Sequence, residues 1–179
     1  LDPAYARNQT IIWPVSQLFN GLVQMDDSLN VIPCIAKNWN ISENGRVYTF
    51  NLRNDVYFHR NELFSSNSKR RKVKASDFEY SFKRILDPAV ASPGRWIFSM
   101  LDRTNPDHPY GFKALNDSVF RIWLERSFPP FLGILTMPYC FVVPHEIVEY
   151  FQKDFSRNPV GTGPFQFAIW RQDEKLVLT

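Results

Sequence analysis

The amino-acid sequence predicts an α+β fold, in which antiparallel hairpins form mixed sheets with flanking helices. Asn44-Gly45 and Asn116-Asp117 are turn dipeptides, and each precedes a run of alternating apolar residues that is typical of a hairpin strand. Between these two turns, the apolar residues of 78–86 recur at helical spacing. Strands and helices therefore follow one another without the regular alternation of a parallel α/β sheet.

The first 60 residues predict one helix and two strands. Residues 1–13 have the pattern of extended chain, and Pro14 stands at the start of a helix whose apolar residues continue to Leu22. Proline interrupts residues 32–39, which predicts a packed connection rather than a strand. Residues 47–52 alternate and predict a strand, and a second short strand is expected at 56–58.

The middle of the chain predicts a second helix and a hairpin. Residues 65–72 form a polar, basic loop, after which Ser76 and Glu79 make a capping box for a helix that stops at Pro88. A short helix is expected at 96–101 and a loop at 105–111. Residues 119–124 alternate and predict a strand.

The last 50 residues predict two helices and a hairpin. Pro129-Pro130 opens one helix and Pro144 opens the other, because proline is tolerated in a first turn. Residues 158–164 hold two glycines and two prolines and mark a chain crossing. Residues 165–170 and 174–179 are then expected to pair across the turn at 171–173.

Composition excludes several classes of protein. The 179 residues suffice for one domain or two small ones, and 44% hydrophobic with 22% charged residues is a globular mixture. Aromatic residues reach 16%, enough to build a core or to line a site that stacks on ligands. A formal charge of +3 is too small to predict a nucleic-acid partner, and the apolar runs are too short for a transmembrane helix.

No metal site is predicted. Cys34 and Cys140 are too few for a disulfide scaffold or a zinc cluster; they pair only if the fold brings them together, and otherwise they are buried, reduced thiols. His145-Glu146-Ile147-Val148-Glu149 resembles half of a zinc-protease helix, but the second histidine is replaced by Glu149. We interpret His145 as a residue of a helix start with solvated acids beside it.

No catalytic residue and no cofactor are predicted either. The sequence has no Gly-x-Ser-x-Gly elbow, and neither cysteine stands in the context of a nucleophile. Gly161-Thr162-Gly163 is too short for a phosphate cradle, since it lacks the lysine and the following helix. The dense basic run Lys69-Arg70-Arg71-Lys72 is expected to be a solvated loop.

Short blocks in fixed order along the whole chain carry one resemblance. They are Leu1-Asp2-Pro3, the residues at 18–22, 31–39, 48–58 and 73–82, Asp87-Pro88, Ala91-Ser92-Pro93, and the residues at 159–165. As an ensemble the chain resembles the solute-binding proteins of ABC importers for oligopeptides, dipeptides and nickel.

The resemblance implies a fragment of a larger protein with a periplasmic-binding-protein-like (type II) fold of two lobes. Residues 1–45 and 160–179 would belong to the large subdomain of lobe one, and residues 46–159 to a small subdomain inserted into it. The rest of lobe one and all of lobe two would lie outside this chain. The implied location is the periplasm or the outer face of the cell membrane, with or without a lipid anchor.

The implied function is to bind a solute, in the first place a peptide, and to deliver it to an ABC permease in the membrane. Such a protein is a monomer and not an enzyme. Two alternatives remain open: a domain of a larger enzyme such as a hydrolase, or a receptor, chaperone or adhesin that keeps the fold but does not serve transport.

The resemblance also implies which residues meet the ligand. In the family, the segment after Leu-Asp-Pro and the segment after Ala-Ser-Pro reach the cleft, which brings forward Arg7, Gln9, Gly94, Arg95 and Trp96.

Two of these positions depart from the oligopeptide binders, which have an acid at the first position and a tyrosine after Ser-Pro. This chain has Arg7 and Gly94 there. Arg7 suits a carboxylate or a phosphate better than a peptide amine, and nothing in the chain favours nickel. The alternatives are a surface role for Arg7 and a packed position for Trp96. Asn20, Gly21 and Gly161-Thr162-Gly163 are expected to be scaffold at the chain crossing.

Overall fold

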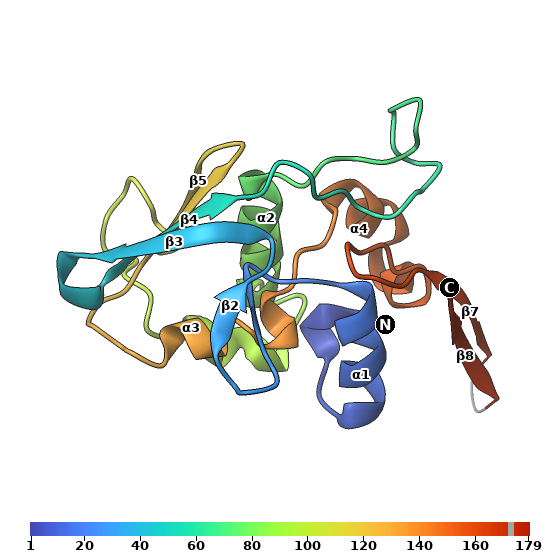
Figure 1. The fold of residues 1–179 in the computed structure, drawn as a ribbon, viewed down its shortest axis with the longest axis horizontal. Coiled ribbons are helices and arrows are strands. Elements are labelled where there is room, and N and C mark those ends of the chain that lie inside the picture. The colour runs from blue at the N-terminus through green and yellow to red at the C-terminus, as the bar shows by residue number, and fades with distance from the viewer. Residues whose placement is uncertain (172–173) are drawn as a thin grey trace.

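The computed structural model describes residues 1–171 and 174–179. Figure 1 shows a four-stranded sheet with helix α2 packed across it, and a two-stranded hairpin at the far end of the molecule. The strands are β1 (Val23–Met25), β2 (Val31–Pro33), β3 (Ala36–Ser42), β4 (Val47–Leu52), β5 (Phe112–Asn116), β6 (Val119–Trp123), β7 (Phe167–Arg171) and β8 (Lys175–Leu178). The α-helices are α1 (Gln9–Leu18), α2 (Ala75–Leu86), α3 (Phe131–Ile134) and α4 (His145–Phe151). Five 3₁₀ turns connect them: η1 (Pro3–Tyr5), η2 (Glu43–Gly45), η3 (Pro93–Phe98), η4 (Pro138–Cys140) and η5 (Gln152–Arg157).

The four-stranded sheet confirms both predicted hairpins. Its order is β3-β4-β6-β5, with every neighbouring pair antiparallel. Asn44 and Gly45 close the β3–β4 hairpin in the left-handed region, with φ of 53° and 85°. Asparagine and glycine are the residues that tolerate this conformation best, so the turn sets the register of the sheet.

Helix α2 covers one face of this sheet and supplies much of the core, as its apolar stripe predicts. The ring of Phe82 packs against Phe98, Phe112 and Phe120, with centroids 4.8, 5.5 and 5.4 Å away. The predicted capping box is wrong in its residues. Asp77, not Glu79, accepts the capping hydrogen bond from the backbone N–H of Lys74 at 2.8 Å, because the helix begins two residues earlier than the predicted box requires.

Helix α1 corrects the prediction for the first 22 residues. It begins at Gln9 rather than at Pro14, and Asn8 caps it by accepting a hydrogen bond from the N–H of Ile11 at 3.1 Å. Pro14 lies inside the helix, where it removes one backbone donor. Burial of Val15 and Leu18 on the following turn offsets that loss.

Residues 32–39 were predicted to be a connection, and this is wrong, because they contribute to β2 and β3. Strand β3 forms because β4 pairs with it, and Trp39 packs near Phe50 with ring centroids 6.5 Å apart. The prediction of a strand at 56–58 is also wrong. It is reduced to a single bridge between Tyr57 and Lys72, since the partner chain there is the irregular basic loop.

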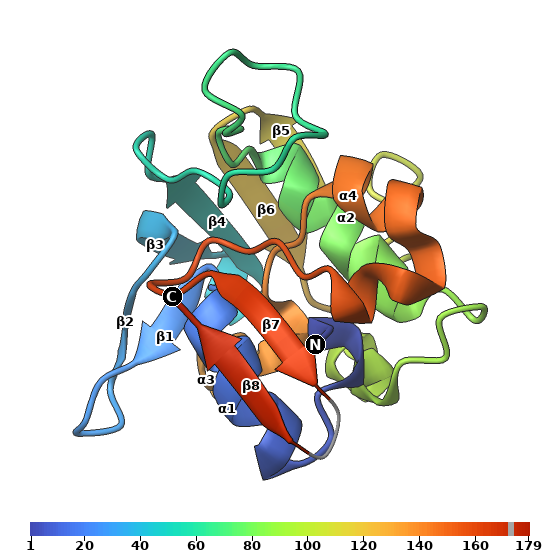
Figure 2. The same cartoon turned by 90° about the vertical axis from the view of Figure 1, so that its right-hand side faces the viewer.

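The second half of the chain follows the prediction closely. Helices α3 and α4 begin directly after Pro130 and Pro144. The segment expected to be helical at 96–101 is the 3₁₀ turn η3, which begins at Pro93 and ends at Phe98. Strands β7 and β8 form the expected hairpin, which lies in front of α1 in Figure 2; Gln172 and Asp173 of its turn lie outside the described residues.

Two properties of the described residues bear on the type of protein. None of their helices combines the length and the hydropathy of a membrane-spanning segment. Cys34 is half-buried, Cys140 is buried, and both are free thiols.

Candidate functional site

The two segments that the resemblance brought forward lie side by side. The hydroxyl of Ser92 donates a hydrogen bond to the carbonyl of Ala4 at 2.7 Å and accepts one from the N–H of Gly94 at 3.1 Å. The hydroxyl of Tyr5 donates to the carbonyl of Val90 at 2.8 Å. These bonds fasten η1 to the start of η3, although more than 80 residues separate them in sequence.

A third segment, η4, packs against η1 and carries Tyr139. The segments η1, η3 and η4 together form one surface. Gly94 packs so closely on Tyr139 that a Cβ at position 94 would overlap the aromatic ring. Burial raises the pKa of the Tyr139 phenol, and the positive charge of Arg7 acts in the opposite direction. The structure therefore packs Gly94 of η3 onto Tyr139 of η4, and Arg7 follows η1 in the chain.

The other predicted residues lie on the same segments. Gln9 is the first residue of α1 and is exposed, as is Arg7. Arg95 and Trp96 are exposed on η3, and 51% of Trp96 is accessible, so its ring is not packed inside the subdomain. Within residues 1–171 and 174–179, no hydrogen bond or ion pair joins these three side chains to Tyr139.

Sequence reasoning missed two residues of this region. Tyr139 has no motif around it, and only the fold carries it to Gly94. Trp13 is 68% exposed and lies four residues after Gln9, on the same face of α1. Recognition of Asn8 as a helix cap would have found Trp13, because a capping asparagine places the helix start before it.

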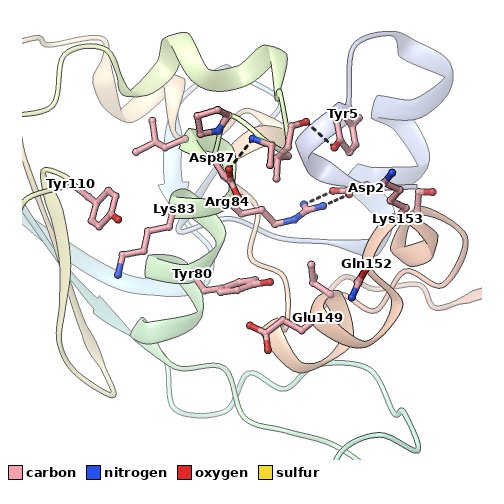
Figure 3. A pocket seen from close by; sticks show the side chains of 16 residues that line it. Asp2, Tyr5, Tyr80, Lys83, Arg84, Asp87, Tyr110, Glu149, Gln152 and Lys153 are labelled. Atoms are coloured by element: carbon pink, nitrogen blue, oxygen red, sulfur yellow. Dashed lines mark hydrogen bonds and ion pairs between the residues drawn. The ribbon is translucent and has the colours of Figure 1, made fainter.

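A separate pocket of about 840 Å³ opens between α2, α4 and η1. Figure 3 shows its floor, where Arg84 makes a bidentate ion pair with Asp2 at 2.8 and 2.5 Å. Tyr5, Tyr80 and Tyr110 contribute to its walls, and acidic and basic side chains alternate around it. None of the five predicted site residues lines this pocket.

The chain crossing at Gly161-Thr162-Gly163 is scaffold, as predicted. A Cβ at Gly161 would overlap the carbonyl of Leu18, and a Cβ at Gly163 would overlap that of Gln17. The hydroxyl of Thr162 donates to the side-chain oxygen of Asn20 at 3.0 Å. Glycine is required here because two backbone segments touch.

One predicted feature of the basic run is wrong. Arg71 is not solvated: it pairs with the buried carboxylate of Asp77 at 2.7 and 2.9 Å and with Glu146 at 2.9 Å. Its guanidinium also lies 4.8 Å from the ring centroid of Phe58. The Arg71 guanidinium is buried because the carboxylate of Asp77 is buried, and a buried carboxylate is stable only with a charged or hydrogen-bonding partner.

The described residues contain no group of three or more His, Cys, Asp or Glu side chains that could hold a metal ion. His145 is the first residue of α4 and is about half exposed, with Nδ1 3.4 Å from Glu146 and 3.8 Å from Asp77. The helix start agrees with the interpretation, but the expectation of solvated acids is wrong for Asp77, which is buried, and Glu146 is paired with Arg71.

Comparison with known proteins identifies close relatives of the whole chain. It is 30% identical to di/tripeptide-binding protein 2 of Pseudomonas aeruginosa (strain UCBPP-PA14) over 98% of its own length and 34% of that protein. It is 29% identical to the probable deoxycholate-binding periplasmic protein of Escherichia coli (strain K12), over 98% of the chain and 33% of that protein. The chain thus spans about a third of the length of these relatives.

The fold is shared with solved structures of the same kind. The ABC transporter-associated periplasmic binding protein DppA from Helicobacter pylori, in complex with the peptide STSA, matches with a TM-score of 0.83 and 29% identity, over 99% of this chain and 36% of the other. The family model for bacterial extracellular solute-binding proteins, family 5 (middle region), matches residues 30–179. With the fold and the sequence in agreement over nearly its whole length, the chain belongs to family 5 of the bacterial extracellular solute-binding proteins.

Proposed function

We propose that this chain is part of the first lobe of a solute-binding protein that captures a peptide outside the cytoplasm and delivers it to an ABC permease. The observation that carries the proposal is the joining of η1, η3 and η4 into one surface. It packs Gly94 against Tyr139 and fastens η1, which leads to Arg7, beside the start of η3. Arg7 and Gly94 stand at positions where the family resemblance implies ligand contacts.

The ligand class is supported by the relatives. One is named as a di/tripeptide-binding protein, and a structural neighbour holds the peptide STSA. A peptide is recognised mainly through hydrogen bonds to its main chain, and wet, roomy surroundings then accept varied side chains. The name of another relative refers to deoxycholate, so a non-peptide solute is the second candidate.

The proposed ligand-contacting residues are Arg7, Gln9, Gly94, Arg95 and Trp96. All but Gly94 are exposed, and these four carry long polar or aromatic side chains. In the full-length protein, the ligand would lie between this surface and a second lobe, and closure about a hinge would bury it. Affinity then includes the free energy of closure.

The proposed subdomains are residues 1–45 with 160–179, and residues 46–159. The tight crossing at Gly161 and Gly163 supports a boundary there, because it packs residues after 159 directly onto α1. Strand β3 lies before the first boundary but pairs with β4 after it, and thus links the two parts.

The proposed protein acts as a monomer, without catalytic activity, in the periplasm or at the outer face of the membrane, where a lipid anchor could hold it. The family's name as extracellular and the naming of the relatives as binding proteins support this. A hydrolase and a non-transport receptor on the same fold are the alternatives.

Calorimetry on the full-length protein with an equimolar mixture of tripeptides tests this function. We expect saturable binding that weakens about tenfold or more in Arg7→Ala and Trp96→Ala, since each removes a charged or stacking contact. Arg60→Ala, in an exposed loop away from η1, is the matched control and should leave binding unchanged. Peptides recovered intact after binding argue against the hydrolase, and absence of any peptide binding would refute the proposal.

A further inference from the structure

We propose that the pocket between α2, α4 and η1 is a ligand site separate from the peptide surface, and that it binds a small cation with an aromatic or apolar body. We call it the α2–α4 pocket. None of the five proposed ligand-contacting residues lines it, so this inference goes beyond the proposed function.

The size and shape of the α2–α4 pocket suit a small molecule. Its volume is about 840 Å³, within the range of about 300–1,000 Å³ that small-molecule sites occupy. Helical spacing places Tyr80 and Arg84 on one face of α2, and Val148 and Glu149 line the opposite wall from α4. Figure 3 shows Tyr80 and Arg84 extending from α2 toward α4, and Glu149 extending from α4 toward α2. The two helices therefore enclose the space from opposite sides.

Hydrogen bonds hold two parts of the pocket in place. On the floor, the guanidinium of Arg84 donates to both oxygens of Asp2, at 2.8 and 2.5 Å. On the side of η1, the hydroxyl of Tyr5 donates to the carbonyl of Val90 at 2.8 Å. All four residues line the pocket, so a ligand would meet a surface that is already formed and would lose little affinity to reorganisation.

The charges that line the pocket favour a cation. Arg84 is neutralised by Asp2, and Lys83 is neutralised by Glu79, whose carboxylate accepts a hydrogen bond from the lysine Nζ at 2.6 Å. Three further charged side chains line the pocket and belong to no ion pair among residues 1–171 and 174–179: Asp87, Glu149 and Lys153. Two carboxylates against one ammonium group leave an excess of negative charge, which attracts a cation and repels an anion.

Glu149 lines the pocket together with an aromatic ring. The ring centroids of His145 and Tyr80 are 5.8 Å apart, and Glu149 follows His145 by one helical turn on the same face of α4. The face of a tyrosine ring attracts cations, and the Nζ of Lys83 lies in such a position, 5.0 Å from the ring centroid of Tyr110. A cation in the pocket would therefore be attracted both by the carboxylate of Glu149 and by the ring of Tyr80.

The rest of the lining favours an apolar body. Leu86, Val90 and Val148 line the pocket together with three tyrosines. An aromatic or aliphatic group that packs against them is removed from water, which contributes to binding in proportion to the buried area. A small amphipathic cation gains from this burial and from the negative charge. A neutral analogue gains from the burial alone, and an anion is in addition repelled.

The test compares three probes that share a phenyl group, on the full-length protein: phenethylammonium, uncharged phenethyl alcohol and the anion hydrocinnamate. Ligand-observed NMR gives their affinities after saturation with an equimolar tripeptide mixture, which keeps the probes from the peptide surface. Glu149→Gln removes the proposed anchoring charge, and Glu149→Lys reverses it. Both variants should fold, because Glu149 is exposed and makes no side-chain bond in the part of the chain that the structure describes. Glu62→Gln, 74% exposed in a loop outside the pocket, is the matched control.

We expect wild type and Glu62→Gln to bind phenethylammonium about threefold or more tightly than phenethyl alcohol, and hydrocinnamate most weakly. Glu149→Gln should bind the cation and the alcohol equally within about twofold, and Glu149→Lys should bind hydrocinnamate most tightly.

Four results would overturn the inference while the peptide function stands. They are equal affinity of wild type for the three probes, a preference for the cation that survives in Glu149→Gln, competition between phenethylammonium and the tripeptides, and no binding of any probe. A protein that binds phenethylammonium as expected but takes up no tripeptide would support the inference and refute the proposed function.

Discussion

Asp2 and Arg84 form a bidentate ion pair that fastens the beginning of the chain to the last turn of α2. Both side chains are largely buried, with 3% and 11% of their surface exposed. The two oxygens of Asp2 face the two terminal nitrogens of Arg84, and Asp2 also accepts from the N–H of Ala4 at 2.9 Å. The pair thus positions η1, and through η1 the segment that carries Arg7.

Removal of one partner of this pair should be costly. We expect Asp2→Ala to destabilise the folded protein by about 3–5 kcal/mol, because it leaves a buried guanidinium without its counter-charge. The matched control is Glu62→Ala, which breaks the exposed pair between Arg60 and Glu62 and should cost less than about 1 kcal/mol. Urea denaturation of the full-length protein measures both. Equal midpoints for the two variants would contradict the importance of the buried pair.

The contact between Gly94 and Tyr139 predicts the effect of a single methyl group. Gly94→Ala should destabilise by about 1–3 kcal/mol, since the new Cβ must displace the Tyr139 ring. Gly133→Ala in α3 is the control, because its Cβ would meet only the end of Met25 at 3.7 Å, an ordinary contact. Thermal denaturation should separate the two variants, and a neutral Gly94→Ala would show that the ring is not fixed.

His59 predicts a dependence of stability on pH. Its Nε2 donates to the carbonyl of Gly163 at 2.8 Å, and its Nδ1 accepts from the N–H of Gly161 at 3.4 Å, so only the neutral ring satisfies both bonds. Burial, with the nearby charge of Arg70 acting in the same direction, lowers the pKa of His59 below its usual value of 6.5. The unfolded chain therefore binds more protons than the folded one between these two pKa values. Stability from this group is complete above pH 6.5 and is lost as the pH falls toward the lower value.

Denaturation midpoints at about pH 5.5 and about pH 7.5 measure this effect. His59→Gln should reduce the difference between them, because glutamine can donate to Gly163 but does not titrate. His145→Gln, at a half-exposed position, should retain the difference. An unchanged pH dependence in His59→Gln would exclude this histidine as its source.

Arg71 joins the basic loop to the first turns of α2 and α4. Arg71→Lys should destabilise by about 1–3 kcal/mol, because an ammonium group cannot make the bidentate bond to Asp77 and reach Glu146 as well. Arg70→Lys, whose exposed guanidinium stacks 5.6 Å from the ring centroid of Tyr57, should cost little. Urea denaturation gives the free energy of unfolding of both variants. The difference between them is the contribution of the buried network, apart from the general effect of replacing an arginine by lysine.

Local patterns in the sequence predicted the elements whose signals are local. The left-handed turn at Asn44 and Gly45 and the apolar stripe of α2 depend on near neighbours only. Strand β3 could not be predicted, because it forms only through its pairing with β4. Pro33, at the end of β2, also made the residues before β3 look like an irregular connection. Helix α1 was misplaced because Pro14 favours a helix start, whereas burial of the next turn overrides that preference.

The candidate site was predictable only in part. The resemblance pointed to the segments that carry Arg7 and Gly94, and the hydrogen bonds of Ser92 to Ala4 and Gly94 hold these two segments side by side. Tyr139 could not be found from sequence, since it lies 45 residues after Gly94 and meets it only through tertiary packing. Burial of Arg71 was missed for a similar reason: a run of four basic residues is usually solvated, and only the fold sets the buried Asp77 beside one of them.

Native mass spectrometry of the full-length protein, purified gently from its own host, tests the central claim most directly. A protein that captures peptides outside the cytoplasm should carry a heterogeneous set of small peptide adducts that disappear on denaturation, with fewer adducts in Arg7→Gln. A protein that carries no adduct, and takes up none when it is incubated with a tripeptide mixture, would contradict the account.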